Sequence, residues 1–249
     1  MQSLDWFTPE DREGVQNRVL ELARADGRIS AGAFTGSTSR DAMDRFSDVD
    51  IAFAVTNEAD TEPIADEWTA LLDRELGVVH HWDLRRGALL YRVFLFQNGL
   101  ELDIGLIPRD EFGARGPSFR LIFGESAERL SVPPPPADDL IGLGWHHALH
   151  ARAAIQRGHA WKAEFYISAL KDHALALPCI RLGEPFDYAR GIDGLPRELT
   201  EPYEETLVRS LDPGELRRAL SAASALFLGE VAETKPALAE RLRPLLRRS

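Results

Sequence analysis

The stretch Ile29-Ser30-Ala31-Gly32-Ala33-Phe34-Thr35-Gly36-Ser37, followed later by Asp48-Val49-Asp50-Ile51-Ala52-Phe53-Ala54-Val55, decides the fold of this chain. Each part predicts a short buried strand, the first ending in a Gly-Ser turn and the second opening on two aspartates. Because side chains alternate along a strand, Asp48 and Asp50 point the same way. Two like charges held that close favour a cation between them, and we expect magnesium.

The Gly-Ser turn is typical of a phosphate-binding loop. At Gly36 a phosphate can approach the backbone closely, and Ser37 offers a hydroxyl and an N–H at the expected start of a short helix. Arg40 follows closely in the sequence and is a candidate for binding a phosphate oxygen.

A third carboxylate lies on a later expected strand, within Leu100–Ile107. Alternation places Glu101 and Asp103 on one face and the apolar residues between them on the other. A carboxylate inside an apolar strand is costly unless it is solvated, paired or bound to a metal. Asp103 is therefore a candidate third ligand. Two magnesium ions held by such carboxylates can clamp the attacking and leaving oxygens of an in-line displacement.

The alternative interpretation is that the three aspartates are unrelated surface residues. Asp48 would then cap a turn, and Asp103 would pair with an arginine such as Arg92. The order, the spacing and the strand context favour the metal site.

Composition limits the class of protein. The chain has 249 residues, of which 44% are hydrophobic, so it can bury a substantial core. A formal net charge of -11 argues against broad capture of nucleic acid and fits a cationic small-molecule partner better. The single cysteine, Cys179, lies in an apolar run and is expected to be a buried small hydrophobe.

We expect no membrane association. The start of the chain, Met1–Asp5, lacks the basic and apolar regions of a signal peptide. No apolar stretch approaches the ~20 residues that a membrane span needs. The expected location is the cytoplasm.

The first half predicts a mixed sheet with helices. Thr8 as N-cap, Pro9 and Asp11 predict a helix that ends near Asp26-Gly27, and a second helix runs from about Thr61 to Gly77. Asn98-Gly99 predicts a hairpin turn. The expected strands are 29–35, 49–55, 78–84, 88–96 and 100–107, with an edge strand at 119–123.

Pro133-Pro134-Pro135-Pro136 predicts a domain boundary, because such a run joins neither a helix interior nor a central strand. The later residues read as helices over 138–157, 161–182, 196–211 and from 213 nearly to the end. The predicted class is α+β, with an N-terminal mixed-sheet catalytic domain (1–132) followed by an all-helical bundle domain (137–249).

Taken in order, Gly36-Ser37, Ser47-Asp48-Val49-Asp50-Ile51 and Leu102-Asp103-Ile104 resemble the motifs of the DNA polymerase beta-type nucleotidyltransferase superfamily. A compact catalytic domain followed by a helical domain is similar to its antibiotic nucleotidyltransferases, which modify aminoglycosides or lincosamides. The motifs cover roughly residues 28 to 107, and the domain layout extends the likeness less specifically over the rest.

The resemblance implies two magnesium ions, ATP or another nucleoside triphosphate as donor, and transfer of a nucleoside monophosphate to an acceptor with release of pyrophosphate. It implies that Asp48 and Asp50 are metal ligands that hold the triphosphate, and that Asp103 binds the second ion near the acceptor hydroxyl. Gly36-Ser37 would grip the terminal phosphates. The bulky segment Met43-Asp44-Arg45-Phe46 is a departure from a plain polar loop and leaves the aim of Arg40 open.

In the helical half, Glu164, Ser168 and Lys171 share one helix face. If that face closes over the active cleft, Lys171 would meet the triphosphate and Glu164 would act as general base. The helical domain would then bind or enclose the substrate. The alternative is a solvated polar stripe opposite a core of Phe165, Ala169 and Leu170.

Two groups of histidines have weaker patterns. Trp145-His146-His147 with His150 has the spacing of transition-metal ligands, but a helix-packing role is favoured because no carboxylate or cysteine lies at matched spacing. His80-His81 alternates across a strand, and a sheet-surface role is favoured over one near an acceptor pocket.

The predicted function is magnesium-dependent transfer of AMP from ATP to a hydroxyl of a small molecule, with an aminoglycoside-like antibiotic as leading acceptor and antibiotic resistance as context. Transfer to a protein or tRNA, as in toxin-like members, is one alternative, and a nucleotide-binding module without turnover is another. The lack of basic patches weighs against RNA, and the full set Asp48, Asp50 and Asp103 weighs against the module. The acceptor, the preferred base and the oligomeric state stay open.

Overall fold

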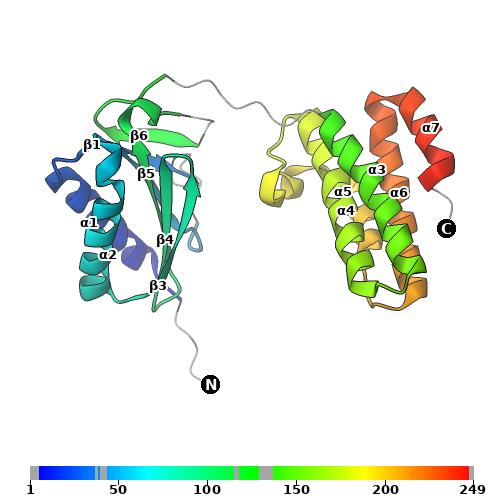
Figure 1. The fold of residues 1–249 in the computed structure, drawn as a ribbon, viewed down its shortest axis with the longest axis horizontal. Coiled ribbons are helices and arrows are strands. Elements are labelled where there is room, and N and C mark those ends of the chain that lie inside the picture. The colour runs from blue at the N-terminus through cyan, green and yellow to red at the C-terminus, as the bar shows by residue number, and fades with distance from the viewer. Residues whose placement is uncertain (1–5, 37–38, 40–43, 115–117, 129–136, 247–249) are drawn as a thin grey trace. The chain divides into compact units, whose positions relative to one another are not determined.

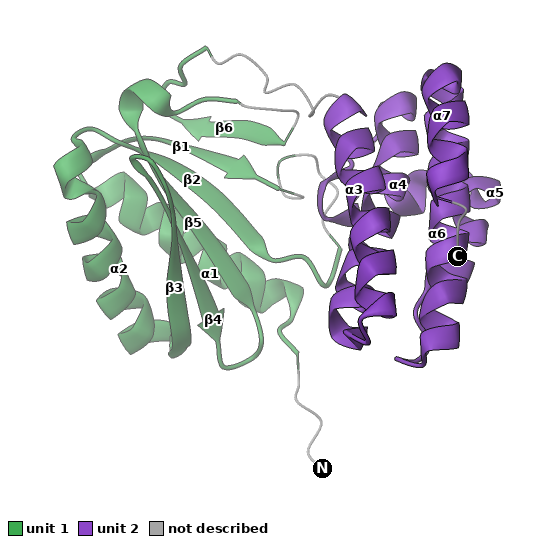
Figure 2. Cartoon of the chain, turned by 45° about the vertical axis from the view of Figure 1, so that its right-hand side comes forward, with its two compact units in different colours: residues 1–132 green, residues 133–249 purple. Residues whose placement is uncertain are grey.

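The chain forms two compact units, Met1–Val132 and Pro133–Ser249. The computed structural model describes residues 6–36, 39, 44–114, 118–128 and 137–246, so the proline run 133–136 lies outside the described residues. The first unit holds a mixed six-stranded sheet and the second holds helices (Figure 1; Figure 2, green and purple), which confirms the α+β class. None of the described helices combines the length and apolar character that a bilayer crossing requires.

The helices of the first unit, α1 (Pro9–Ala25) and α2 (Thr61–Leu76), begin and end on the predicted signals. The Thr8 hydroxyl accepts from the Asp11 N–H at 3.1 Å, and Asp11 Oδ2 accepts from the Thr8 N–H at 2.8 Å, so the capping box is complete. Helix α2 ends at Gly77, whose φ of 72° lies in the left-handed region.

The sheet has the strand order β3-β4-β5-β2-β1-β6. Its strands are β1 (Ile29–Thr35), β2 (Val49–Val55), β3 (Val78–Arg86), β4 (Leu89–Phe96), β5 (Glu101–Pro108) and β6 (Phe119–Phe123). Strands β2 and β5 pair in parallel, and the other neighbours pair antiparallel. The β4–β5 hairpin turns at Asn98-Gly99 as predicted, with the Gly99 N–H donating to the Phe96 carbonyl at 3.0 Å.

One face of the sheet packs against α1 and α2 (Figure 1). Alternate residues of β2 and β5 form the centre of this core with apolar side chains of the two helices: Val49, Ile51, Phe53, Leu102, Ile104 and Leu106 from the strands, and Val19, Ile64, Trp68 and Leu72 from the helices. A smaller cluster around Phe112 covers the alanines of β1 and β2 on the opposite face. This alternation decides which face each carboxylate occupies.

Arg92 links β3, β4 and α2 on the helix-covered face. Its buried guanidinium donates to both oxygens of Asp83, at 2.7 and 2.9 Å, and to Asp66 Oδ1 at 2.8 Å. The pairing with Arg92 holds the pKa of Asp83 below its usual value. A charge buried at this depth is stable only because it is paired and hydrogen-bonded.

The second unit is built from α3 (Ala137–Gln156), α4 (Ala160–Leu182), α6 (Pro213–Thr234) and α7 (Pro236–Leu246). Buried residues of these helices form two neighbouring clusters, one around Phe227 and Leu170 and the other around Ile167 and Ala219. Helices α3 and α6 approach closely at Gly144, where a Cβ would overlap the ring of Phe227. Cys179 is buried, as predicted.

Two helix predictions in this unit are wrong. The segment predicted as a helix over 196–211 contains only α5 (Arg197–Thr200) and the 3-10 helix η6 (Glu201–Thr206), because Pro202 lacks the N–H needed to continue an α-helix. The last predicted helix is divided at Lys235, which precedes Pro236 and has a non-helical φ of -138°.

Helix α4 contains Pro178 in its interior and still continues to Leu182. Proline has no N–H to donate to the carbonyl four residues earlier, which belongs to Ala174. The buried hydroxyl of Tyr203 donates to the Ala174 carbonyl at 3.1 Å instead. A side chain from η6 therefore replaces the missing backbone hydrogen bond.

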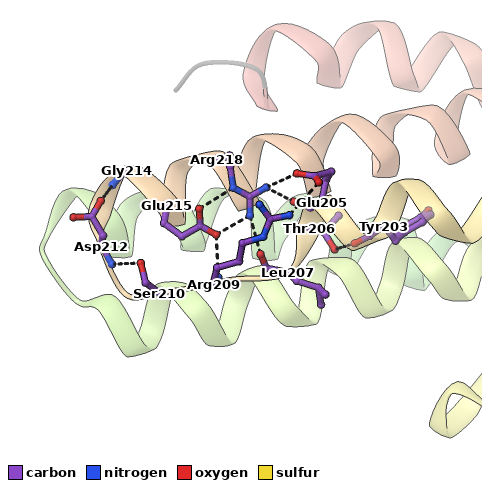
Figure 3. A network of polar contacts seen from close by, with 10 residues as sticks. All are labelled: Tyr203, Glu205, Thr206, Leu207, Arg209, Ser210, Asp212, Gly214, Glu215 and Arg218. Carbon is purple, nitrogen blue, oxygen red and sulfur yellow. Dashed lines mark hydrogen bonds and ion pairs between the residues drawn. The ribbon is translucent and has the colours of Figure 1, made fainter.

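The segment between η6 and α6 is held by a network around Arg218 (Figure 3). The Arg218 guanidinium donates to both carboxylate oxygens of Glu215, at 2.8 and 2.7 Å, and to the Leu207 carbonyl at 2.8 Å. The hydrogen bonds from Arg218 and from the Arg209 N–H to the Glu215 carboxylate lower the pKa of Glu215 to about 2. Asp212 caps α6 by accepting from the Gly214 N–H at 2.7 Å.

Candidate functional site

Asp48, Asp50 and Asp103 lie at one end of the parallel pair β2–β5. Asp48 directly precedes β2, and Asp50 is the register partner of Asp103. Neighbouring strands are about 4.8 Å apart, and paired residues point to the same face. Because the flanking residues of both strands face the helix-covered core, the aspartates occupy the opposite face. The structure brings this predicted set to one place.

Asp103 is the most perturbed of the three. It is half-buried, and its Oδ1 atom is buried with no hydrogen-bond partner. Burial raises its pKa to about 6, and the negative charges of Asp48 and Glu101 add to this effect. A carboxylate in such surroundings needs a positive group, and among the residues that the structure describes none donates to its Oδ1 atom.

The alternative pairing of Asp103 with Arg92 is wrong. Arg92 is the register partner of Ile104, not of Asp103, so its side chain lies on the helix-covered face. Its guanidinium is already paired with Asp83 and Asp66. A one-residue difference in register therefore separates the arginine from the carboxylate.

Gly36 lies next to the carboxylate of Asp50. It directly follows β1 and has a φ of 58°, and a Cβ at this position would overlap that carboxylate. The Ser39 hydroxyl donates to the Gly36 carbonyl at 2.8 Å and fixes the turn. Ser37 and Arg40 lie outside the described residues. Only glycine fits this close to Asp50, and a glycine backbone also allows a phosphate to approach closely.

Arg12 of α1 positions the loop that leads into Asp48. This buried side chain donates through Nη1 to the carbonyls of Asp44 and Ser47. Asp44 in turn accepts from the Phe46 N–H at 2.8 Å. Sequence reasoning missed Arg12, although its spacing with Val15 and Val19 on the buried helix face is a signal for a partnered inward-facing arginine.

The carboxylates fit a divalent cation by their chemistry, although they do not form a preassembled cage. Among the described residues, no three His, Cys, Asp or Glu side chains are arranged to hold a metal ion. The partnerless Asp103 Oδ1, the adjacent Asp50 and the nearby charge of Asp48 nevertheless supply the oxygen ligands that magnesium takes alongside water and phosphate.

Two aromatic residues share the face of the carboxylates. The register runs from Trp82 through Val93 to Asp103, and Tyr91 lies over Gly105. Trp82 is 50% exposed, which is unusual for a tryptophan on a sheet. Sequence reasoning missed both. Counting alternate positions back from Asp103 through the β4–β5 hairpin would have placed Tyr91 on this face, whereas Trp82 also requires the register across the β3–β4 turn.

Glu164 and Lys171 lie on α4 of the second unit. Glu164 accepts from the Ser168 hydroxyl at 2.8 Å, and Lys171 pairs with Asp172 at 3.5 Å. The alternative core is wrong at Phe165, which is 62% exposed, whereas Leu170 is buried. The closing of this face over the aspartates stays a prediction.

Comparison with family models and with curated proteins gave no match. Among solved structures, the chain is similar to an aminoglycoside 6-adenyltransferase from Bacillus subtilis, with 17% identity over 95% of this chain and 97% of that one and a TM-score of 0.43. It is also similar to a nucleotidyltransferase-like protein from Exiguobacterium sibiricum, with 15% identity over 94% of this chain and 80% of that one and a TM-score of 0.36. These similarities are distant.

We expect Gly36→Ala to destabilise the first unit more than Gly87→Ala does. Both glycines have a positive φ, which costs an L-residue about 1–2 kcal/mol, but nothing lies within 4 Å of a Cβ at Gly87. The overlap with Asp50 should add about 1–3 kcal/mol at Gly36. Urea unfolding measures both losses. Equal losses, or an excess that persists in an Asp50→Ala background, would disprove the contact.

We expect Asp103→Asn to stabilise the metal-free protein at pH 7.5. The folded pKa of about 6 exceeds the ordinary value of 3.8, so the folded state binds more protons and loses stability as the pH rises from about 4 to 6. Above pH 6 the loss is complete and amounts to about 2–3 kcal/mol. Unfolding at pH 7.5 and pH 3.5 should show a gain for the variant only at the higher pH. Asp73→Asn, at an exposed position on α2, is the control, and an equal gain at both pH values would refute the assignment.

Proposed function

We propose that this protein is a magnesium-dependent nucleotidyltransferase that transfers a nucleoside monophosphate, AMP from ATP as first choice, to a hydroxyl of a small molecule and releases pyrophosphate. The observation that carries the proposal is the pairing of Asp50 with Asp103 beside the tight approach of Gly36. It combines carboxylates that need a cation with a turn that admits a phosphate.

In this proposal Asp48, Asp50 and Asp103 hold two magnesium ions. When bound, the ions neutralise the triphosphate and stabilise charge on the attacking and leaving oxygens. Asp103 is the ligand on the acceptor side, while Asp48 and Asp50 lie on the donor side next to the Gly36 turn. The Gly36 backbone receives the terminal phosphates, with Ser37 and Arg40 as further contacts.

Features of the carboxylate face support a small, cationic acceptor. Trp82 offers an exposed ring surface in the same register row as Asp103, and Glu101 adds a negative charge near it. A planar aromatic side chain beside carboxylates suits an acceptor that carries rings, hydroxyls and ammonium groups. An aminoglycoside-like antibiotic is the leading candidate of this class.

The second unit completes the reaction in this proposal. Glu164 serves as general base for the acceptor hydroxyl, and Lys171 binds the triphosphate. The short hydrogen bond from Ser168 orients the Glu164 carboxylate and leaves its second oxygen available to a proton. The first unit is thus the catalytic domain, and the helical unit binds or encloses the substrate.

The direct test is a pyrophosphate-release screen of the full chain with each of the four nucleoside triphosphates over an antibiotic and metabolite panel. Release that requires both magnesium and a small-molecule acceptor supports the proposal. Label transferred from nucleotide to RNA or protein, with no small molecule modified, would refute this acceptor class. Nucleotide binding without release across the panel and these macromolecules would refute the transferase assignment.

Asp50→Asn should abolish transfer while leaving the fold intact, because it withdraws a metal ligand and not core volume. Replacing even outer-shell partners of a metal typically costs 10–100-fold, so we expect a loss of at least about 100-fold in kcat/KM. Asp73→Asn, an exposed carboxylate on α2, is the matched control. Near-normal pyrophosphate release by Asp50→Asn would overturn the metal assignment.

Glu164→Gln should lower kcat by roughly 100-fold or more with little change in ATP affinity, because general-base catalysis typically contributes about 10²–10⁴-fold. Steady-state kinetics and ATP titration separate the two effects. Glu198→Gln, exposed on α5, provides the same change away from the predicted face. If ATP binding weakens instead, Glu164 belongs to the donor site and not to the base.

A further inference from the structure

Histidines from two helices gather in the second unit, far along the chain from the aspartates. His147 of α3 contacts His173 of α4, and His146 contacts His150 on α3. Tyr166 of α4 contacts His147 and His150. The ring centroids of His146 and His150 are 4.2 Å apart, and those of His147 and His173 are 5.0 Å apart. Sequence reasoning assigned the α3 histidines to packing and did not include His173.

One nitrogen of His147 and one of His173 are separated by about the distance between two ligands of one metal ion. Nδ1 of His147 and Nε2 of His173 are 3.2 Å apart. Two imidazole nitrogens that each lie 2.0–2.1 Å from a tetrahedral zinc ion are about 3.3 Å from each other. Both rings are half-buried, so solvent and ions can reach them. The separation therefore already matches that of two ligands, and the rings must turn from the hydrogen-bonded arrangement so that both nitrogen lone pairs converge on the ion.

We propose that His147 and His173 form a binding site for a divalent transition ion of the zinc class, which links α3 to α4. In the metal-free chain the same two nitrogens share a hydrogen bond, so one donates its N–H and the other accepts. Binding requires the donor ring to move that proton to its other nitrogen, with no net loss of a proton from the neutral pair. Among the described residues no third His, Cys, Asp or Glu completes the shell, so water takes the remaining positions.

The surroundings favour neutral rings that are ready to bind. Burial lowers the pKa of His147 and of His173, which keeps both imidazoles in the ligating form at neutral pH. Tyr166 packs against His147 and His150 and restricts the rings. Asp172 adds a negative charge next to His173, offset by its ion pair with Lys171, and Lys162 lies over Tyr166.

The test is titration of the full chain with zinc chloride in excess magnesium, which occupies the carboxylates, monitored by calorimetry and by thermal unfolding. Magnesium alone is the control ion. We expect saturable one-site binding and a rise in melting temperature of roughly 5 °C at saturating zinc. His147→Gln and His173→Gln should each weaken zinc binding by at least about tenfold. His80→Gln, on the sheet, should bind as the unchanged chain does.

Cobalt(II) provides a second measurement that does not depend on the stability of any variant. The visible spectrum of the cobalt-loaded chain should show nitrogen ligation at pH 7.5. No saturable zinc binding to the full chain would overturn the proposal. Binding that survives in both single variants and is lost in the His146→Gln/His150→Gln variant would also overturn it, because the ion would then occupy a different pair.

Discussion

The parallel pairing of β2 with β5 is the constraint on which the candidate site depends. Its register sets Asp50 beside Asp103, while Ile51 and Ile104, one residue further along, are buried against the helices. A slip of one residue would bury the carboxylates and expose the apolar side chains. Hydrophobic burial on one face of the sheet therefore holds like charges together on the other, although their repulsion opposes it. Burial of the Asp103 carboxylate raises its pKa, and the negative charges of Asp48 and Glu101 add to this effect.

Like groups are held together in the second unit as well, by helix packing. His147 and His173 are brought to hydrogen-bonding distance because α3 and α4 share a closely packed core. The same helix, α4, carries Glu164 and Lys171. An ion bound between the histidines would hold α4 against α3, and α4 carries the proposed general base and the proposed triphosphate ligand. The two proposed metal sites differ in ligand type, since oxygen suits magnesium and imidazole suits zinc.

Local signals were predictable from the sequence, whereas pairings over long sequence distances were not. Thr8 and Asp11 are neighbours in the chain, so their capping box could be predicted, and alternation placed Asp103 on its face without a structure. The partners of Arg92 depend on which face of β4 it occupies relative to α2, and the sequence did not identify Asp83 and Asp66. Tertiary packing determines which loop Arg12 contacts and brings His147 to His173. No local sequence pattern predicts either contact. The helix predicted over 196–211 extends past Pro202, which ends an α-helix.

The hydrogen bond from Tyr203 to the Ala174 carbonyl has a consequence for the order in which the chain folds. Helix α4 cannot satisfy its own backbone around Pro178, because the partner of that carbonyl is a side chain from later in the sequence. During synthesis, the Ala174 carbonyl lacks its Tyr203 partner until residue 203 has left the ribosome and docked. A hairpin of α3 and α4 made alone should therefore fray at this end of α4.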